Sequence, residues 1–223
     1  MIELKRFVSP LLDQNMYVVC EGGHCIVIDP YNSLESEQLL EGLQPDFMMV
    51  THEHYDHISG VNAFKKYYRI PLYANSTCNT NMQNPRKNFA KYEEAYLNFQ
   101  KGVSIEEKEI LSVDARYTCH ADFILEDGQT LDWRGHRIFV KMSPGHSAGS
   151  NLIFLDEFCM FSGDCMLPPN IPAARFPGGD PRAFREITLP YLKSLDGNTV
   201  VHPGHYDSFH LKEFHLLQKE ADS

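Results

Sequence analysis

Five short apolar runs in this sequence each end in an aspartate or a histidine. They are Ile26–Asp29, Met48–His52, Val140–His146, Met160–Asp164 and Val200–His205. Short apolar runs that are bounded by turn residues predict buried strands. In an open α/β sheet, polar side chains at the ends of such strands lie along one edge, where ligands bind. The pattern therefore predicts an α/β fold whose functional groups gather at strand ends.

The densest group of these polar residues is Thr-His-Glu-His-Tyr-Asp-His at positions 51–57. Imidazole nitrogen and carboxylate oxygen are ligands that suit zinc, iron or manganese. The apolar run Phe47–Val50 before the group predicts a strand, and Ile58–Phe64 after it begins an amphipathic pattern. The candidate ligands His52, His54, Asp56 and His57 are therefore expected on a strand-to-helix turn.

The same reasoning assigns elements along the rest of the chain. Predicted strands are Ile2–Val8, Met16–Cys20, Cys25–Ile28, Phe47–Val50, Pro71–Ala74, Phe123–Leu125, Gln129–Trp133, His136–Lys141, Asn151–Leu155, Phe158–Phe161 and Thr199–His202. Predicted helices are Leu34–Leu43, Ile58–Tyr68, Arg86–Gln100, Pro181–Leu192 and Leu211–Lys219. Residues 75–113 interrupt the alternation of strands and helices. We expect a helical insertion there, near the active site, which forms either a wall or lid over the site or a packed surface helix.

Composition narrows the class of protein and of partner. The 223 residues, 43% of them hydrophobic, predict one domain over residues 1–223. The formal net charge of -10 argues against nucleic acid or an anionic membrane as a partner. No apolar run reaches the roughly 18 residues of a membrane-spanning helix. Six scattered cysteines and an N-terminus without an apolar signal segment predict a cytoplasmic protein. The expected partner is a small-molecule substrate.

Several motifs together resemble those of the metallo-β-lactamase-fold hydrolases, and within them the glyoxalase II-like (hydroxyacylglutathione hydrolase-like) branch. The matching pieces are residues 51–57, Pro-Gly-His-Ser-Ala-Gly-Ser at 144–150, Ser-Gly-Asp at 162–164, Pro-Gly-His at 203–205, Asp29, and Phe-Pro-Gly-Gly-Asp at 176–180. The resemblance implies a four-layer α/β/β/α sandwich that binds two divalent metal ions. The expected metal is zinc, with iron or manganese as alternatives.

The resemblance also implies a role for each candidate residue. One metal ion would be held by His52, His54 and His146. The other would be held by Asp56, His57 and His205, and Asp164 would bridge the two. Asp29 would orient the ligand loop through hydrogen bonds. Candidate residues of the substrate pocket are Arg175, Phe176, Tyr206 and the aromatic residues of 86–100.

The chemistry implied by the resemblance is hydrolysis of a small thioester or ester by a metal-bridging hydroxide, with Asp56 as the catalytic carboxylate that orients it or takes its proton. Asp164 stands where true metallo-β-lactamases carry cysteine or serine, which argues against lactam hydrolysis. The short stretch after His205 predicts weak selectivity for glutathione. Alternatives are a lactonase and a mononuclear iron persulfide dioxygenase-like enzyme, which would use His52, His146 and Asp164.

Overall fold

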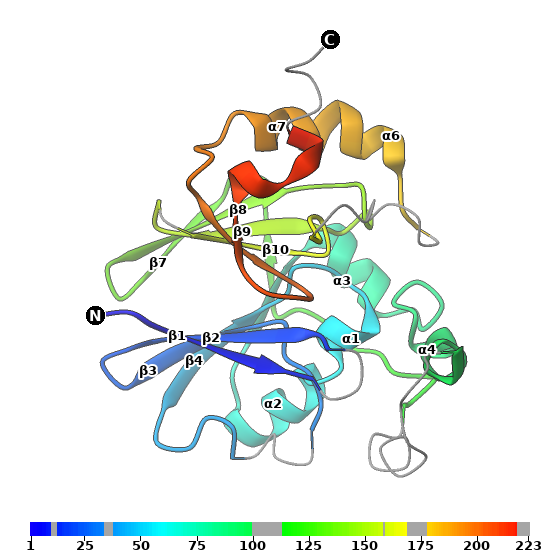
Figure 1. The fold of residues 1–223 in the computed structure, drawn as a ribbon. Coiled ribbons are helices and arrows are strands. Elements are labelled where there is room, and N and C mark those ends of the chain that lie inside the picture. The colour runs from blue at the N-terminus through cyan, green and yellow to red at the C-terminus, as the bar shows by residue number, and fades with distance from the viewer. Residues whose placement is uncertain (10–12, 34–37, 100–112, 158, 169–177, 218–223) are drawn as a thin grey trace. The chain divides into compact units, whose positions relative to one another are not determined.

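The computed structural model describes residues 1–9, 13–33, 38–99, 113–157, 159–168 and 178–217. Contacts divide the chain into two units, Met1–Ile124 and Leu125–Ser223. The described strands form two six-stranded sheets, one built from the N-terminal half and one from the C-terminal half. Figure 1 shows strands flanked by helices in both halves.

The first sheet is mixed, and its strands follow one another in chain order. They are β1 (Glu3–Val8), β2 (Asn15–Glu21), β3 (His24–Ile28), β4 (Gln44–Met49), β5 (Leu72–Asn75) and β6 (Phe123–Leu125). Strands β1, β2 and β3 pair antiparallel, whereas β3, β4 and β5 pair parallel. Gly22 and Gly23 have φ of 57° and 82°, the positive values that a two-residue hairpin turn requires.

Parallel pairing explains why two polar segments meet in this unit. Ile28 at the end of β3 is paired with Met49 at the end of β4. The backbone N–H of Asp29 donates to the carbonyl of Met49 over 3.0 Å. The residue after β3 therefore lies beside the segment that follows β4, which is the candidate ligand loop.

The ligand loop leads into helices that pack on this sheet. The described helices of the first unit are α1 (Tyr55–Ile58), α2 (Val61–Tyr68), α3 (Ser76–Met82) and α4 (Ala90–Phe99). Val61 and Phe64 of α2 are fully buried against the strands, as the amphipathic pattern predicts. The expected helix from Ile58 to Tyr68 is broken at Gly60. A Cβ on Gly60 would lie 2.5 Å from the carbonyl oxygen of Tyr31, so the chain passes too close for any side chain.

Two other predicted helices of the first unit differ from the structure. Residues 38–42 of the predicted helix Leu34–Leu43 form turns, which end at Gly42 with φ of 79°, and residues 34–37 lie outside the described part. The predicted helix Arg86–Gln100 begins only at Ala90. Asn88 caps this start because its Oδ1 accepts from the Ala90 N–H over 3.0 Å. Residues 100–112 of the predicted insertion also lie outside the described residues.

The second sheet is also mixed. Its strands are β7 (Thr130–Trp133), β8 (His136–Met142), β9 (Asn151–Leu155), β10 (Cys159–Gly163), β11 (Val200–Pro203) and β12 (Phe209–His210), with β10 and β11 paired parallel. The predicted helix Pro181–Leu192 is present as α6 (Pro181–Ala183), a π-helical turn (Phe184–Thr188) and α7 (Leu189–Lys193). Leu192 of this helix packs with Leu152, Met160 and Val201 in the core of the unit.

The C-terminal segment is less helical than the sequence predicts. The expected helix Leu211–Lys219 is present as two short 3₁₀ turns, Leu211–Glu213 and His215–Leu217, and residues 218–223 lie outside the described part. None of the helices in the described ranges combines the length and the apolar character needed to cross a bilayer.

Candidate metal centre

The first unit gathers four candidate ligands on the ligand loop, residues 51–57, which runs from the end of β4 into α1 and has Asp56 and His57 in the helix. The ring centroid of His52 lies 4.6 Å from that of His54 and 4.2 Å from that of His57. The Oδ2 atom of Asp56 is 3.4 Å from Nε2 of His57. His52 and His57 are buried, with 1% and 0% exposure. The loop therefore places three imidazoles and one carboxylate within reach of one another, as the motif predicts.

Asp29 fixes this loop from the end of the neighbouring strand. Its Oδ1 accepts from the Thr51 backbone N–H over 2.6 Å. Its Oδ2 accepts from the Thr51 hydroxyl over 2.6 Å and from Nδ1 of His57 over 2.8 Å. Asp29 is itself buried and has a positive φ of 55°. One buried carboxylate thus receives three donors from the ligand loop, which restrains both its backbone and one of its rings.

The same hydrogen bonds determine which ring nitrogens carry a proton. His57 donates from Nδ1 to Asp29, which leaves the lone pair of the neutral ring on Nε2. The Thr51 hydroxyl proton is directed to Asp29, so Oγ1 accepts from Nδ1 of His52 over 3.1 Å. Both histidines are therefore held in the tautomer whose Nε2 can bind a metal ion. This donor chemistry fits a divalent metal.

Residues 75–113 and the segment after them contact the ligand loop within the first unit. Nδ2 of Asn81 donates to Oε1 of the buried Glu53 over 2.7 Å. The Phe89 ring lies edge-on to His54, with centroids 4.6 Å apart. The Tyr117 hydroxyl donates to the carbonyl of Ile58 over 2.7 Å. The described part of the predicted insertion therefore supports the loop that carries the candidate ligands.

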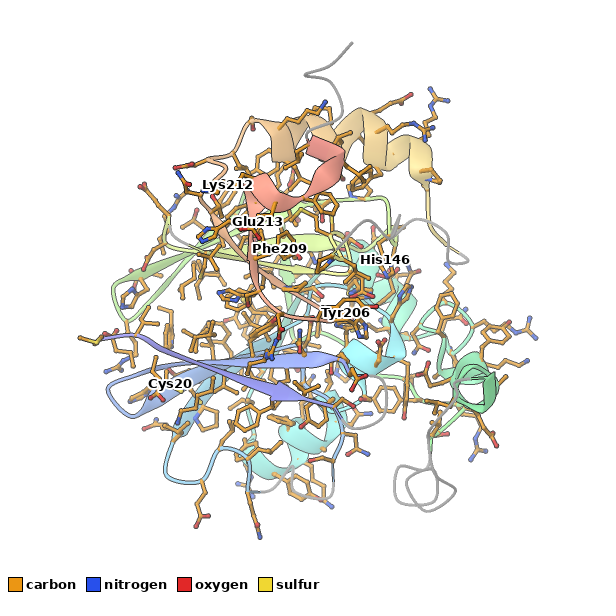
Figure 2. The ribbon with its side chains drawn as sticks, viewed as in Figure 1. Cys20, His146, Tyr206, Phe209, Lys212 and Glu213 are labelled. Atoms are coloured by element: carbon orange, nitrogen blue, oxygen red, sulfur yellow. The ribbon has the colours of Figure 1, made fainter. Side chains whose placement is uncertain are left out.

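The second unit groups the other three candidate ligands around one carboxylate. Oδ2 of Asp164 lies 3.7 Å from Nε2 of His146 and 3.5 Å from Nε2 of His205. Asp164 directly follows β10, and His205 lies two residues beyond the parallel strand β11. The backbone N–H of Gly204 donates to the carbonyl of Gly163 over 2.9 Å, which joins the two strand ends. Figure 2 marks His146 among the side chains of this unit.

A tight turn after β8 holds His146. The Thr188 hydroxyl donates to the carbonyl of Pro144 over 2.7 Å, and the Asp180 N–H donates to that of Gly145 over the same distance. Gly145 has φ of 153°, and a Cβ there would lie 2.7 Å from Cβ of Phe184. The turn therefore requires glycine directly before the candidate ligand. The helix that includes the π-helical turn holds this loop in place.

His202 has a different environment from His205. Its Nδ1 lies 2.7 Å from the Ser208 hydroxyl, and its ring stacks on Phe161 with centroids 5.2 Å apart. These contacts fit a structural role for His202. Arg175 and Phe176, which the sequence proposes for the substrate pocket, lie outside the described residues, as does the Phe-Pro part of the 176–180 motif.

Residues that sequence reasoning missed act on the loop rather than as ligands. The Thr51 hydroxyl connects the Asp29 carboxylate to Nδ1 of His52. The position of Thr51 at the start of the motif is the sequence feature that could have identified this role. Asn81 and Tyr117 carry no such signal because their contacts with the loop join residues 28 and 59 positions apart. Burial raises the pKa of Tyr55, within the loop, to about 12, so this phenol stays neutral at physiological pH.

Comparison with known families gives a match over most of the chain. A family model described as the metallo-beta-lactamase superfamily matches residues 10–205. A Bacillus subtilis protein named "Probable metallo-hydrolase YqgX" is 23% identical over 202 residues, which cover 89% of this chain and 87% of that protein. A hydroxyacylglutathione hydrolase of Photobacterium profundum is 25% identical over 184 residues, which cover 82% of this chain but only 57% of that enzyme.

Solved structures show the same fold. TTHA1623 in a di-iron-bound form matches with a TM-score of 0.73 and 25% identity, over 94% of this chain and 96% of that one. The BLEG-1 B3 metallo-beta-lactamase matches with a TM-score of 0.72 and 24% identity, over 95% of both chains. The predicted metallo-β-lactamase fold, α/β with two mixed sheets, is therefore confirmed.

Proposed function

Because the chain belongs to the metallo-beta-lactamase superfamily, we propose that it is a metal-dependent hydrolase that holds two divalent ions and cleaves a small thioester or ester. The observation that carries the proposal is the hydrogen-bond network of Asp29. Asp29 binds Nδ1 of His57 directly and acts on Nδ1 of His52 through the Thr51 hydroxyl, so the Nε2 lone pair of each ring can bind a metal ion. Two neighbouring histidines that are both held with the proton on Nδ1 are typical of a loop that binds metal through Nε2.

The proposed ligand sets follow the two groups of side chains. His52, His54 and His146 would hold one ion, and Asp56, His57 and His205 the other. Asp164 would serve both ions, since a carboxylate has two oxygens and already lies near two imidazoles in its own unit. A shared carboxylate reduces the repulsion between two cations.

The residues around these ligands have separate tasks in hydrolysis. Divalent ions held here would activate water and polarise the substrate carbonyl. Asp56, whose side chain is 17% exposed, is the most accessible carboxylate of the ligand loop, and we assign to its Oδ2 the proton released by the attacking water. The leaving thiolate takes up that proton from Asp56 after the carbon–sulfur bond breaks, which restores the carboxylate. Asp29 and Thr51 keep the two rings from rotating during the cycle.

A thioester is the first choice of substrate because a relative named hydroxyacylglutathione hydrolase matches most of this chain. Only 57% of that enzyme is matched, so selectivity for the glutathione portion is not part of the proposal. We propose zinc as the metal, and the di-iron form of TTHA1623 supports iron as the alternative. A cytoplasmic location fits six described cysteines that are all free thiols.

The test is reconstitution followed by a substrate screen. Metal-free protein is loaded separately with zinc, manganese and ferrous iron, and hydrolysis of a thioester, an ester, a lactone, a β-lactam and a phosphodiester is measured for each form. The proposal requires thioester or ester hydrolysis that chelation abolishes. If a form that holds one iron per chain consumes oxygen together with a persulfide, the protein is a persulfide dioxygenase-like enzyme instead. Turnover of the β-lactam alone would replace the proposal with a lactamase.

A further inference from the structure

Tyr206 has an unusual backbone conformation directly after the candidate ligand His205. Its φ is 71°, in the left-handed region that bulky residues rarely adopt. Backbone strain of this kind persists where the surrounding structure imposes it, and it concentrates at functional sites. The position therefore requires an explanation other than local preference.

Anchors on both sides of Tyr206 impose this conformation. Before it, the backbone N–H of Gly204 donates to the carbonyl of Gly163 over 2.9 Å. After it, Ser208 lies 2.7 Å from Nδ1 of the buried His202. The chain then enters β12, where Phe209 pairs with Val201. The loop 203–208 is thus closed at both ends, and Tyr206 lies near its tip.

Burial does not account for the strain. The Tyr206 side chain is 54% exposed, so its ring contributes little to the core. Its centroid lies 6.5 Å from that of His205, with the rings inclined at 59°. The next residue, Asp207, is exposed as well. Figure 2 labels Tyr206 on the loop that leads into β12. The anchored loop therefore presents a phenol ring beside a candidate metal ligand and carries an exposed aspartate at the next position.

We infer that Tyr206 is a specificity-determining residue that contacts the leaving group of the substrate and, together with Asp207, favours a cationic or neutral leaving group over an anionic one. The inference rests on the proposed hydrolase function. The face of an aromatic ring carries negative electrostatic potential, which attracts cations and repels anions. The carboxylate of Asp207 acts in the same direction. Thioesters of thiols that carry an amine are thus the preferred substrate class.

Three small acetyl thioesters whose leaving groups carry different charges test this inference. They are the esters of thiocholine, 2-mercaptoethanol and 3-mercaptopropionate, which carry positive, zero and negative charge. With zinc-loaded protein, we expect a KM for the cationic ester at least about fivefold below that for the anionic ester, consistent with one cation–π contact and one surface ion pair. The difference should shrink in high salt.

Four variants assign the preference to this loop. Tyr206→Ala and Asp207→Asn should each reduce the ratio of the KM for the anionic ester to the KM for the cationic ester by about two- to fivefold. Tyr67→Ala, at an exposed tyrosine of α2, and Glu213→Gln, at an exposed carboxylate, are the matched controls and should leave the ratio unchanged. Bound metal, measured for every variant, should not change.

A second comparison tests whether a side chain at position 206 costs stability because of the positive φ there. Tyr206→Gly and Tyr206→Ala both remove the ring, but only glycine adopts a φ of 71° without strain. The glycine variant should therefore have the higher Tm of the two, while both lose the charge preference. Equal Tm values with an unchanged KM ratio would overturn the inference.

Binding of the product thiols separates this inference from the proposed function. Calorimetric titration of zinc-loaded protein with thiocholine and with 3-mercaptopropionate measures the charge preference without turnover. If neither a thioester nor an ester is hydrolysed, the proposed function fails, while tighter binding of thiocholine that depends on Tyr206 still supports the inference. If thioesters are hydrolysed but wild type and Tyr206→Ala show the same order of affinities, the inference fails and the function stands.

Discussion

At the scale of single residues, Asp29 restrains the candidate site although it lies 22 positions before Thr51 in the sequence and is not itself a proposed ligand. It accepts from a backbone N–H, a hydroxyl and an imidazole, and all three donors belong to the ligand loop. Three donors replace the water that a buried carboxylate loses on folding. The structure thus uses an anion next to the ligands to make His57 a stronger electron donor.

Replacement of Asp29 by asparagine tests this role. The amide side chain would offer one acceptor oxygen to donors that now share two, so a buried donor loses its partner. We expect Asp29→Asn to lower the free energy of unfolding by about 1–3 kcal/mol. We also expect a loss of metal affinity of about 10- to 100-fold. Chemical denaturation and competition with a chromogenic chelator measure the two effects.

The control for this variant is another Asp–His pair of the first unit. Asp46 and His24 are 2.8 Å apart, on β4 and β3, and both side chains are about a quarter exposed. Asp46→Asn should cost less stability because water replaces the lost contact, and it should leave metal affinity unchanged. Equal effects of the two substitutions on metal affinity would contradict the role assigned to Asp29.

At the scale of elements, the strands were predictable and several helix boundaries were not. Short apolar runs predict strands, and the run Cys25–Ile28 is a fully buried part of β3. In the run Phe47–Val50, Met48 and Met49 are the buried end of β4. The close approach of the carbonyl of Tyr31 to Gly60, at the break between α1 and α2, is a tertiary contact that no local pattern encodes. Residues 38–42 have helical composition but form turns that lead into β4.

The candidate site follows the same division. The ligand types could be predicted because a motif lists them in order, whereas the contacts of Asn81 and Phe89 with the loop are tertiary. Spacing in the sequence therefore predicts the residues that could bind a metal. It does not predict the residues that hold them.

Gly60 offers a test at this scale. Its φ of -83° suits any residue, so only the closeness of Tyr31 excludes a side chain. Gly60→Ala should therefore lower the free energy of unfolding by about 1–3 kcal/mol through overpacking. Gly42→Asn is the control, because Asn tolerates the positive φ of 79° and space around Gly42 is open. Thermal or urea unfolding that ranks the control as the more damaging change would show that the close contact with Tyr31 does not exclude a side chain at Gly60.

At the scale of the whole molecule, buried thiols make the free energy of unfolding depend on pH above the ordinary pKa of cysteine. Cys25, fully buried in β3, is an example. Burial, and after it the neighbouring Cys20, raises the pKa of its thiol to about 12. The folded chain therefore keeps this thiol neutral at a pH at which the unfolded chain ionises it.

The sign of the pH dependence follows from this difference. The folded-state pKa is the higher one, so the contribution of the thiol is complete below its ordinary pKa and is lost as the pH rises toward about 12. For each such thiol the loss is about 1.4 kcal/mol per pH unit in that window. Cys25→Ala should make the decline of unfolding free energy above about pH 9 shallower by this amount. Urea unfolding between about pH 8 and about pH 11 measures the slope, and identical slopes would contradict the prediction.

We propose above that this chain holds two divalent ions. Metal content is measured by mass spectrometry after metal-free protein has been loaded with excess zinc, or with excess manganese, and freed of unbound metal. We expect two ions per chain in wild type and a loss of bound metal in Asp164→Asn, whose amide cannot offset the repulsion between two cations. His202→Ala, which alters a ring held by Ser208 and Phe161, should keep close to two. At most one ion per chain in wild type with either metal would contradict the account.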